Sequence, residues 1–124
     1  MKKYFFPFVI ALSLVFYYSC TKDKTSLAIP PDCSGVDSLS NTYTLHIKSI
    51  LDNYCATPTC HDAASAQFAV DLSSYSSSVN AFQYKNVICS VKQNGCLPMP
   101  QGGRPLADSL ITAMECWQSH NYPK

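Results

Sequence analysis

The chain has 124 residues and nearly balanced charge, with 9 Lys and Arg against 8 Asp and Glu. A chain of this length forms one domain at most. The balance leaves no basic stripe for nucleic acid and no basic block for an anionic membrane surface, so we expect no nucleic-acid partner.

The N-terminal stretch has the features of an export signal. Two lysines precede an apolar run at 4–18, and the small Ser19 stands directly before Cys20. We predict a lipoprotein signal peptide at 1–19, with Cys20 lipidated as the first residue of the exported chain. The alternative is an uncleaved membrane anchor, but about 15 apolar residues fall short of the roughly 20 that cross a bilayer. The lipid would hold the protein in the cell envelope, at the periplasmic face or in the outer membrane.

A segment rich in Ser, Thr, Asp and Pro follows at 20–41. Pro30 and Pro31 favour an extended backbone there, and no apolar period is sustained. We predict a tether that separates the membrane from one folded domain at 42–124.

Apolar side chains then recur at helical spacing. The members of this stripe are Tyr43, Ile47, Ile50, Leu51 and Tyr54. They predict a helix at 42–54, with Asn41 or Thr42 as its N-terminal cap. His46 lies off the stripe, so we expect it to face solvent and not to bind metal.

That helix leads directly into the stretch Cys55-Ala56-Thr57-Pro58-Thr59-Cys60-His61. Two cysteines followed at once by a histidine are typical of c-type haem attachment, in which the thiols form thioethers to the porphyrin and the histidine binds the iron. Four residues separate the cysteines instead of the usual two, which resembles a variant found among multihaem c-type cytochromes. Residues five apart are turned by about 140° on a helix. Because Pro58 also disfavours helix, we expect the insert to bulge as a loop.

Two other interpretations of this motif stay open. Cys55 and Cys60 could form a plain disulfide, or the Cys, Cys and His side chains could bind zinc. Zinc is disfavoured because adjacent Cys60 and His61 lack the paired spacing of structural zinc sites, and no clear fourth ligand is evident.

The other cysteines are even in number. With the lipidated cysteine and the motif pair set aside, four remain, namely Cys33, Cys89, Cys96 and Cys116. Unpaired thiols are not expected to persist in an oxidising compartment, so we predict two disulfides. An Asn-Gly turn makes a local bridge between Cys89 and Cys96 easy, and a Cys33 to Cys116 bridge would join the ends of the domain. The number of cysteines is also even if Cys55 and Cys60 form a third disulfide, so the number alone does not establish haem.

The middle of the chain carries shorter apolar patterns. The expected core anchors there are Phe68, Val70, Leu72 and Tyr75. We predict a short helix at about 74–82, capped by Ser73, and a further apolar segment at helical spacing within 84–91.

The last predicted element is a helix at 108–119, with Asp108 as its cap. Its apolar face consists of Leu110, Ile111, Met114 and Trp117. We expect this helix to pack across the first one, with Met114 in the core and Trp117 near the helix crossing or the haem edge.

A methionine stands between two prolines in the loop before the last helix, as Pro98-Met99-Pro100. The prolines stiffen the backbone and point the side chain one way, which makes Met99 a candidate axial ligand. A thioether sulfur is a soft ligand, and a His/Met pair is the ligation that raises the haem potential.

In their order, these motifs resemble those of a known family. The matching segments are the helix from Ile47 to Cys55, Cys60-His61, Asp71 to Tyr75, Met99-Pro100-x-Gly-Gly and the terminal helix with Trp117. They resemble small single-haem cytochrome c domains of exported bacterial lipoproteins, including those akin to planctomycete-type cytochrome c. The resemblance covers 42–122. It implies an all-α, cytochrome c-like fold around one covalent haem, with His61 as proximal and Met99 as distal ligand.

One-electron transfer is the function that follows, with haem c attached at Cys55 and Cys60, and with redox proteins and the membrane as partners. No general base or substrate pocket is evident, and both axial positions would be filled, so we do not expect an enzyme. The alternative is a disulfide-stapled surface lipoprotein that acts as a binding module without haem.

Overall fold

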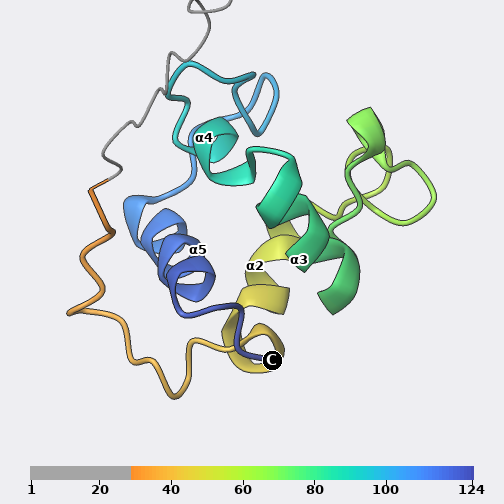
Figure 1. The fold of residues 1–124 in the computed structure, drawn as a ribbon. Helices are drawn as coiled ribbons and strands as arrows, with labels where there is room; N and C mark the ends of the chain where they lie inside the picture. The colour runs from red at the N-terminus through yellow and green to blue at the C-terminus, as the bar shows by residue number, and fades with distance from the viewer. Residues whose placement is uncertain (1–28) are drawn as a thin grey trace, which may run out of the picture.

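The computed structural model describes residues 29–124, and within them the chain forms helices and no strand (Figure 1). The all-α class expected from the sequence is confirmed at that level. The predicted signal peptide at 1–19, the lipidation site Cys20 and the tether residues 20–28 lie outside the described part. No helix in that part is both long and apolar enough to cross a bilayer.

The helix predicted at 42–54 begins as a π-helical turn, η2 (Tyr43–Ile47), which continues directly as α2 (Lys48–Tyr54). Four members of its predicted stripe are buried, namely Tyr43, Ile47, Ile50 and Leu51. The fifth, Tyr54, is 50% exposed. Tyr54 is the last residue of α2 and lines a cavity there.

Thr42 and Asn41 fix the start of this helix in different ways. Thr42 Oγ1 accepts a hydrogen bond from the Leu45 amide at 3.3 Å, so Thr42 is the cap. The side chain of Asn41 is buried, where its Nδ2 donates to the Ala113 carbonyl at 2.9 Å. Its Oδ1 is then left to accept from Nδ1 of His46, 3.0 Å away, and His46 is exposed as predicted. Asn41 thereby ties the start of the first helix to the last one.

The middle helix, α3 (Tyr75–Tyr84), occupies its predicted place but is capped by Ser74 and not by Ser73. Ser74 Oγ accepts from the Ser77 amide, and Ser77 Oγ accepts from the Ser74 amide. This reciprocal pair is a capping box. The Ser73 hydroxyl donates to Asp71 instead, at 2.6 Å, which removes it as a cap.

Two short helical turns flank α3. The first, η3 (Gln67–Ala69), contains Phe68, which we expected in the core but which is 65% exposed. Phe68 has a left-handed φ of 57°, and its ring lines the two cavities described below. The second turn, α4 (Val87–Val91), lies within the apolar segment expected at 84–91, and both of its terminal valines are buried.

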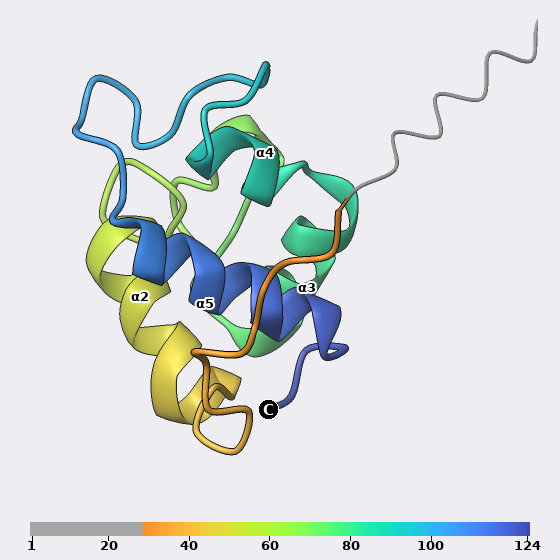
Figure 2. The same ribbon diagram turned by 90° about the vertical axis from the view of Figure 1, so that its left-hand side faces the viewer.

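The last helix, α5 (Asp108–Ser119), has the predicted bounds. The predicted cap is wrong by one residue, because Ala107 holds the cap position and Asp108 is already helical. In the first turn the Asp108 carboxylate still favours the positive end of the helix dipole. As predicted, α5 contacts η2 and crosses the first helix, as Figure 2 shows, and Met114 is fully buried in the core.

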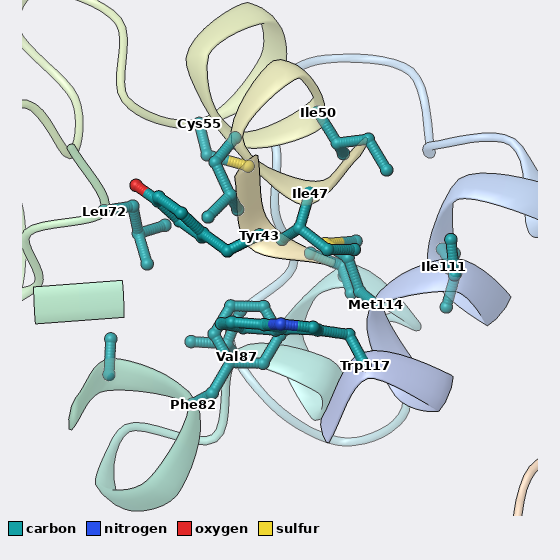
Figure 3. Packing of buried hydrophobic residues seen from close by; sticks show 14 of the residues in the cluster. Tyr43, Ile47, Ile50, Cys55, Leu72, Phe82, Val87, Ile111, Met114 and Trp117 are labelled. Carbon is teal, nitrogen blue, oxygen red and sulfur yellow. The ribbon is translucent and has the colours of Figure 1, made fainter. Parts of the chain in front are cut away.

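Trp117 of α5 lies at the centre of the core and is fully buried (Figure 3). The rings of Phe82 and Tyr122 meet it edge-on, with centroids 5.2 and 5.0 Å away, and the Tyr43 ring lies at 6.0 Å. Each such pair contributes about 0.5–1.5 kcal/mol beyond the area that it buries. The indole Nε1 donates to the Pro123 carbonyl at 2.8 Å. The core therefore satisfies both the apolar and the polar part of this side chain.

Both predicted disulfides are present, Cys33–Cys116 and Cys89–Cys96. The first spans 83 residues and fastens the segment after Pro31 to α5. The second spans 7 residues and ties α4 to the loop that precedes Met99. The chain ends beside η2, since the Tyr43 amide donates to the Pro123 carbonyl at 2.8 Å (Figure 1).

Candidate functional site

Two neighbouring cavities lie on the side of the fold formed by the loops around η3 and before α5. The larger has a volume of about 430 Å³ and the smaller about 280 Å³. Four residues line both of them, namely His61, Phe68, Val91 and Met99. Pockets that hold small molecules or cofactors are typically of this size and are mostly apolar.

The smaller cavity brings together all four residues that the sequence predicts for haem binding. Its wall includes Cys55 and Cys60 with His61 from the motif, and Met99 from the distant proline-rich loop. Apolar side chains complete it, among them Val91 and the buried Leu106. His61 and Met99 are far apart in the sequence, and the fold brings the imidazole and the thioether into the wall of one cavity.

The motif forms a closed loop between its two cysteines. Cys55 ends α2, with φ of −129°, and the amide of Cys60 donates to the Thr57 carbonyl at 3.0 Å. Thr59 has a left-handed φ of 70°, and the His61 amide donates back to the Cys55 carbonyl at 3.2 Å. The insert thus bulges as a loop, as we expected from Pro58. This closure returns the chain to the end of α2, so both cysteines reach the same cavity.

His61 is held with one ring nitrogen engaged by the protein. Its Nδ1 lies 3.1 Å from the carbonyl oxygen of Val70. A carbonyl can only accept, so Nδ1 is the donor, and in the neutral imidazole Nε2 is the nitrogen with the free lone pair. A histidine fixed in this way by a backbone carbonyl is prepared to bind a metal through Nε2. The backbone beside it is fixed as well, because the Leu72 amide donates to the His61 carbonyl at 2.8 Å.

Cys55 and Cys60 are both thiols and are not joined to each other. Cys55 is buried, and burial, followed by the nearby Cys60, raises the pKa of the Cys55 thiol to about 11. Cys60 is exposed. Cys55 is therefore almost entirely protonated at neutral pH in the metal-free chain.

Within residues 29–124, no group of three or more His, Cys, Asp or Glu side chains is arranged to hold a metal ion. The zinc alternative thus finds no ligand cluster in the described part. The motif cysteines also do not form the plain disulfide that we left open, although the other four described cysteines are paired.

Met99 is positioned by the backbone on both sides of its loop. Its amide donates to the carbonyl of Ser90 at 3.1 Å, which attaches the loop to α4. The Cys89–Cys96 bridge holds the same stretch from the other direction. The side chain is partly buried, packs against the core and lines both cavities.

Several lining residues were missed by the sequence analysis. The larger cavity also contacts Lys85 and Asn86, which join α3 to α4, and Ser90 of α4. Lys85 is the one charged side chain among the residues that line either cavity. A signal did exist, because Asn adopts the left-handed conformation more readily than most residues. An Asn that follows an apolar stripe and precedes another marks a sharp break between helices.

Comparisons of the chain with protein-family models, with curated proteins and with solved structures returned no match. The function is therefore argued from the geometry of this site.

Proposed function

We propose that this protein is a one-electron carrier of the c-type cytochrome class, with a single haem c held between His61 and Met99. The observation that carries the proposal is the convergence of four side chains on one cavity, namely Cys55, Cys60, His61 and Met99. The first three come from the end of α2 and its loop, and the fourth comes from the loop after α4.

The donor set fits the group. His61 offers Nε2 because Nδ1 is engaged by the Val70 carbonyl. Met99 offers a soft thioether, which together with an imidazole forms a ligation that raises the haem potential. Cys55 and Cys60 supply two thiols beside these ligands, and each would add its sulfur and hydrogen across one vinyl double bond. That addition balances without an oxidant and releases nothing.

When bound, the haem supplies an iron that cycles between the ferric and ferrous states. The chain's own part is to hold both axial ligands, to exclude water and to set the potential. Buried Leu72, Val87, Val91 and Leu106 contribute the apolar wall. An apolar surrounding disfavours the more highly charged state of the centre. If His61 and Met99 both bind the iron, no position on it is left for a substrate, so we propose a carrier and not an enzyme.

Electron carriers work with redox proteins, and we propose such proteins as the partners. The exported location rests on the leading sequence, in which Cys20 would carry the lipid that anchors the domain in the cell envelope.

A haem stain of a denaturing gel tests this function. The full chain is expressed in a host that attaches haem to c-type cytochromes, beside a Cys55→Ala/Cys60→Ala variant. Covalent haem survives denaturation, so we expect a stained band for the unchanged chain and none for the variant. An unstained band of full-length protein, with the mass of the bare chain, would falsify the proposal.

Axial ligation is tested by the visible spectrum of the stained protein. Met99→Ala is expected to abolish the weak sulfur-to-iron band of the ferric state. Met114→Ala is the matched control, because Met114 is fully buried in the core and does not line either cavity. Retention of the band in Met99→Ala would exclude Met99 as the ligand.

The second candidate is a surface lipoprotein that binds another molecule without haem, stapled by disulfides. The two disulfides in the fold agree with the stapled part of this candidate. In that case the same gel gives no stain, and the intact mass carries no added haem. The two candidates therefore give opposite results in one sample.

A further inference from the structure

We propose that Lys85 and Asn86 bind the propionate carboxylates of the haem, so that the porphyrin has one defined direction across the two cavities. This inference rests on the proposed function. It concerns a pair of residues that the haem motif does not include, at the junction of α3 and α4 (Figure 1).

The two cavities differ in their chemistry. Both motif cysteines line the smaller cavity and neither lines the larger one. Lys85, Asn86 and Ser90 line the larger cavity and not the smaller one. His61 and Met99 line both. A flat group ligated by His61 and Met99 therefore has a thiol end on one side and a polar, cationic end on the other.

Haem has the same asymmetry. Its vinyl groups lie along one edge of the porphyrin, and its two propionates lie along the opposite edge. Because thioethers to Cys55 and Cys60 would fix the vinyl edge in the smaller cavity, the propionate edge is directed to the larger one. That direction places two carboxylates near the only cationic side chain that lines either cavity, which is Lys85.

Lys85 has no carboxylate partner within the described residues. The lysines that are paired there are Lys48 with Asp52 and Lys92 with Glu115. No Asp or Glu lines either cavity, so nothing in the wall competes for the Lys85 ammonium. The backbone beneath it is fixed, because the Lys85 amide donates to the Ala81 carbonyl at 2.8 Å. An ammonium and a carboxylate form a charge-assisted hydrogen bond, which is stronger than a neutral one.

Asn86 adds a neutral donor beside this charge. It occupies the cap position of α4, yet its side chain makes no capping hydrogen bond. Its backbone is left-handed, with φ of 55° and ψ of 33°, a conformation that Asn tolerates better than most residues. The amide is therefore not committed to the helix and is available to donate to a carboxylate at the wall of the larger cavity.

The inference is tested on the haem-loaded protein by two measurements, the reduction potential and the resonance Raman band of propionate bending. The variants are Lys85→Gln, Lys85→Glu, Lys85→Arg and Asn86→Gly, in which Gly preserves the left-handed backbone. Lys92→Gln is the control, since it removes one positive charge just after α4, at a residue that lines neither cavity.

We expect the potential to fall in Lys85→Gln, to fall further in Lys85→Glu and to return toward the starting value in Lys85→Arg. Loss of the cation leaves the propionate charge uncompensated, which favours the ferric state. The propionate band should shift in Lys85→Gln and in Asn86→Gly but not in Lys92→Gln. A purely structural role of Lys85 would not move that band.

Failure of the inference can be separated from failure of the proposed function. A stained protein whose propionate band is the same in every variant, and whose potential changes equally in Lys85→Gln and Lys92→Gln, overturns the assignment of Lys85 and Asn86 alone. An unstained protein overturns the haem itself.

Discussion

The core side of this small domain, around Trp117, differs in its packing from the cavity side, around Met99. Around Trp117, side chains meet one another, and the indole donor is satisfied by the Pro123 carbonyl. Around Met99, side chains line two cavities, and their polar groups are held mainly by loop backbone, as in the His61 contact with Val70. The core side is closely packed, whereas the cavity side leaves open space between its side chains.

Backbone conformation differs between the two sides in degree. The loop above the cavities holds three non-glycine residues at positive φ in close succession, namely Ala66, Phe68 and Ala69, whereas on the core side Asn121 and Tyr122 have a positive φ. Such conformations cost of order 1–3 kcal/mol each and cluster where structure serves function. Stability should therefore reside on the core side, and substitutions on the cavity side should change function more than stability.

Opening the long disulfide is expected to cost the most stability. In a haem-free Cys55→Ala/Cys60→Ala background, Cys33→Ser with Cys116→Ala frees a bridge that spans 83 residues. The chain-entropy estimate for a loop of that size is about 4.5 kcal/mol, against about 2.5 kcal/mol for the short Cys89–Cys96 bridge. Urea unfolding measures both losses. If removal of the short bridge costs as much as removal of the long one, the core side is not the main source of stability.

Two methionines allow the next comparison. Met114 is fully buried, and Met114→Ala in the same haem-free background is expected to cost about 3 kcal/mol through the cavity that it creates. Met99 is only partly buried beside existing cavities, so Met99→Ala should cost less than about 1 kcal/mol. Urea unfolding of both variants measures the difference. Equal costs would contradict the division into two sides.

Asn41 tests the polar support of the core side. Asn41→Ala removes a buried hydrogen bond from the side-chain amide to the Ala113 carbonyl, which keeps its place in the helical ladder of α5. We expect a loss of about 1 kcal/mol in unfolding free energy. His46→Ala is the control, because it removes the exposed partner of the same amide and should change stability by less than about 0.5 kcal/mol.

The smallest effect at neutral pH concerns Cys55 in the haem-free chain. Burial raises the pKa of its thiol from 9.0 to about 11, so its thiolate fraction should rise tenfold for each pH unit below 11. Alkylation of Cys55, followed by mass spectrometry, should be slow at pH 8 and accelerate with that slope. Cys60 is exposed and provides the internal comparison. A Cys55 that reacts as fast as Cys60 at pH 8 would show that the thiol is not buried.

The sign of the matching stability change follows from linkage. Between pH 9 and 11 the unfolded chain has already lost the Cys55 proton while the folded chain retains it. Unfolding free energy should therefore fall as the pH rises through this range, and Cys55→Ala should remove that part of the fall. An unchanged pH dependence in Cys55→Ala would contradict the assignment.

Much of the core side could be predicted from the sequence, and the reason is periodicity. In η2, α2 and α5 the apolar residues recur at helical spacing because they face the core. This spacing predicts the bounds of α5 and the burial of Met114 correctly. The capping residues were harder to predict from the sequence, because a cap depends on the dihedral angles of a single residue. Ser73 and Ser74 are identical in type, and only the bond from Ser73 to Asp71 decides between them.

The cavity side was predictable only in part. Cys55, Cys60, His61 and Met99 carry their chemistry in their residue types and spacing, so they could be chosen before the fold was seen. For Asn86 the sequence carries only the signal that Asn readily adopts the left-handed conformation. It carries none for Lys85 or for the exposure of Phe68, because the turns that bring them to the cavities leave no apolar period.

The Cys33–Cys116 bridge also determines how mechanical load enters the domain. A pull along the leading segment arrives at Cys33 and crosses directly into α5 through the sulfur bridge. Everything between the two cysteines, including α2, α3, α4 and both cavities, belongs to a covalent ring that lies outside this load path. Tension on a tether would therefore be carried by α5, and the loops that hold His61 and Met99 would keep their geometry.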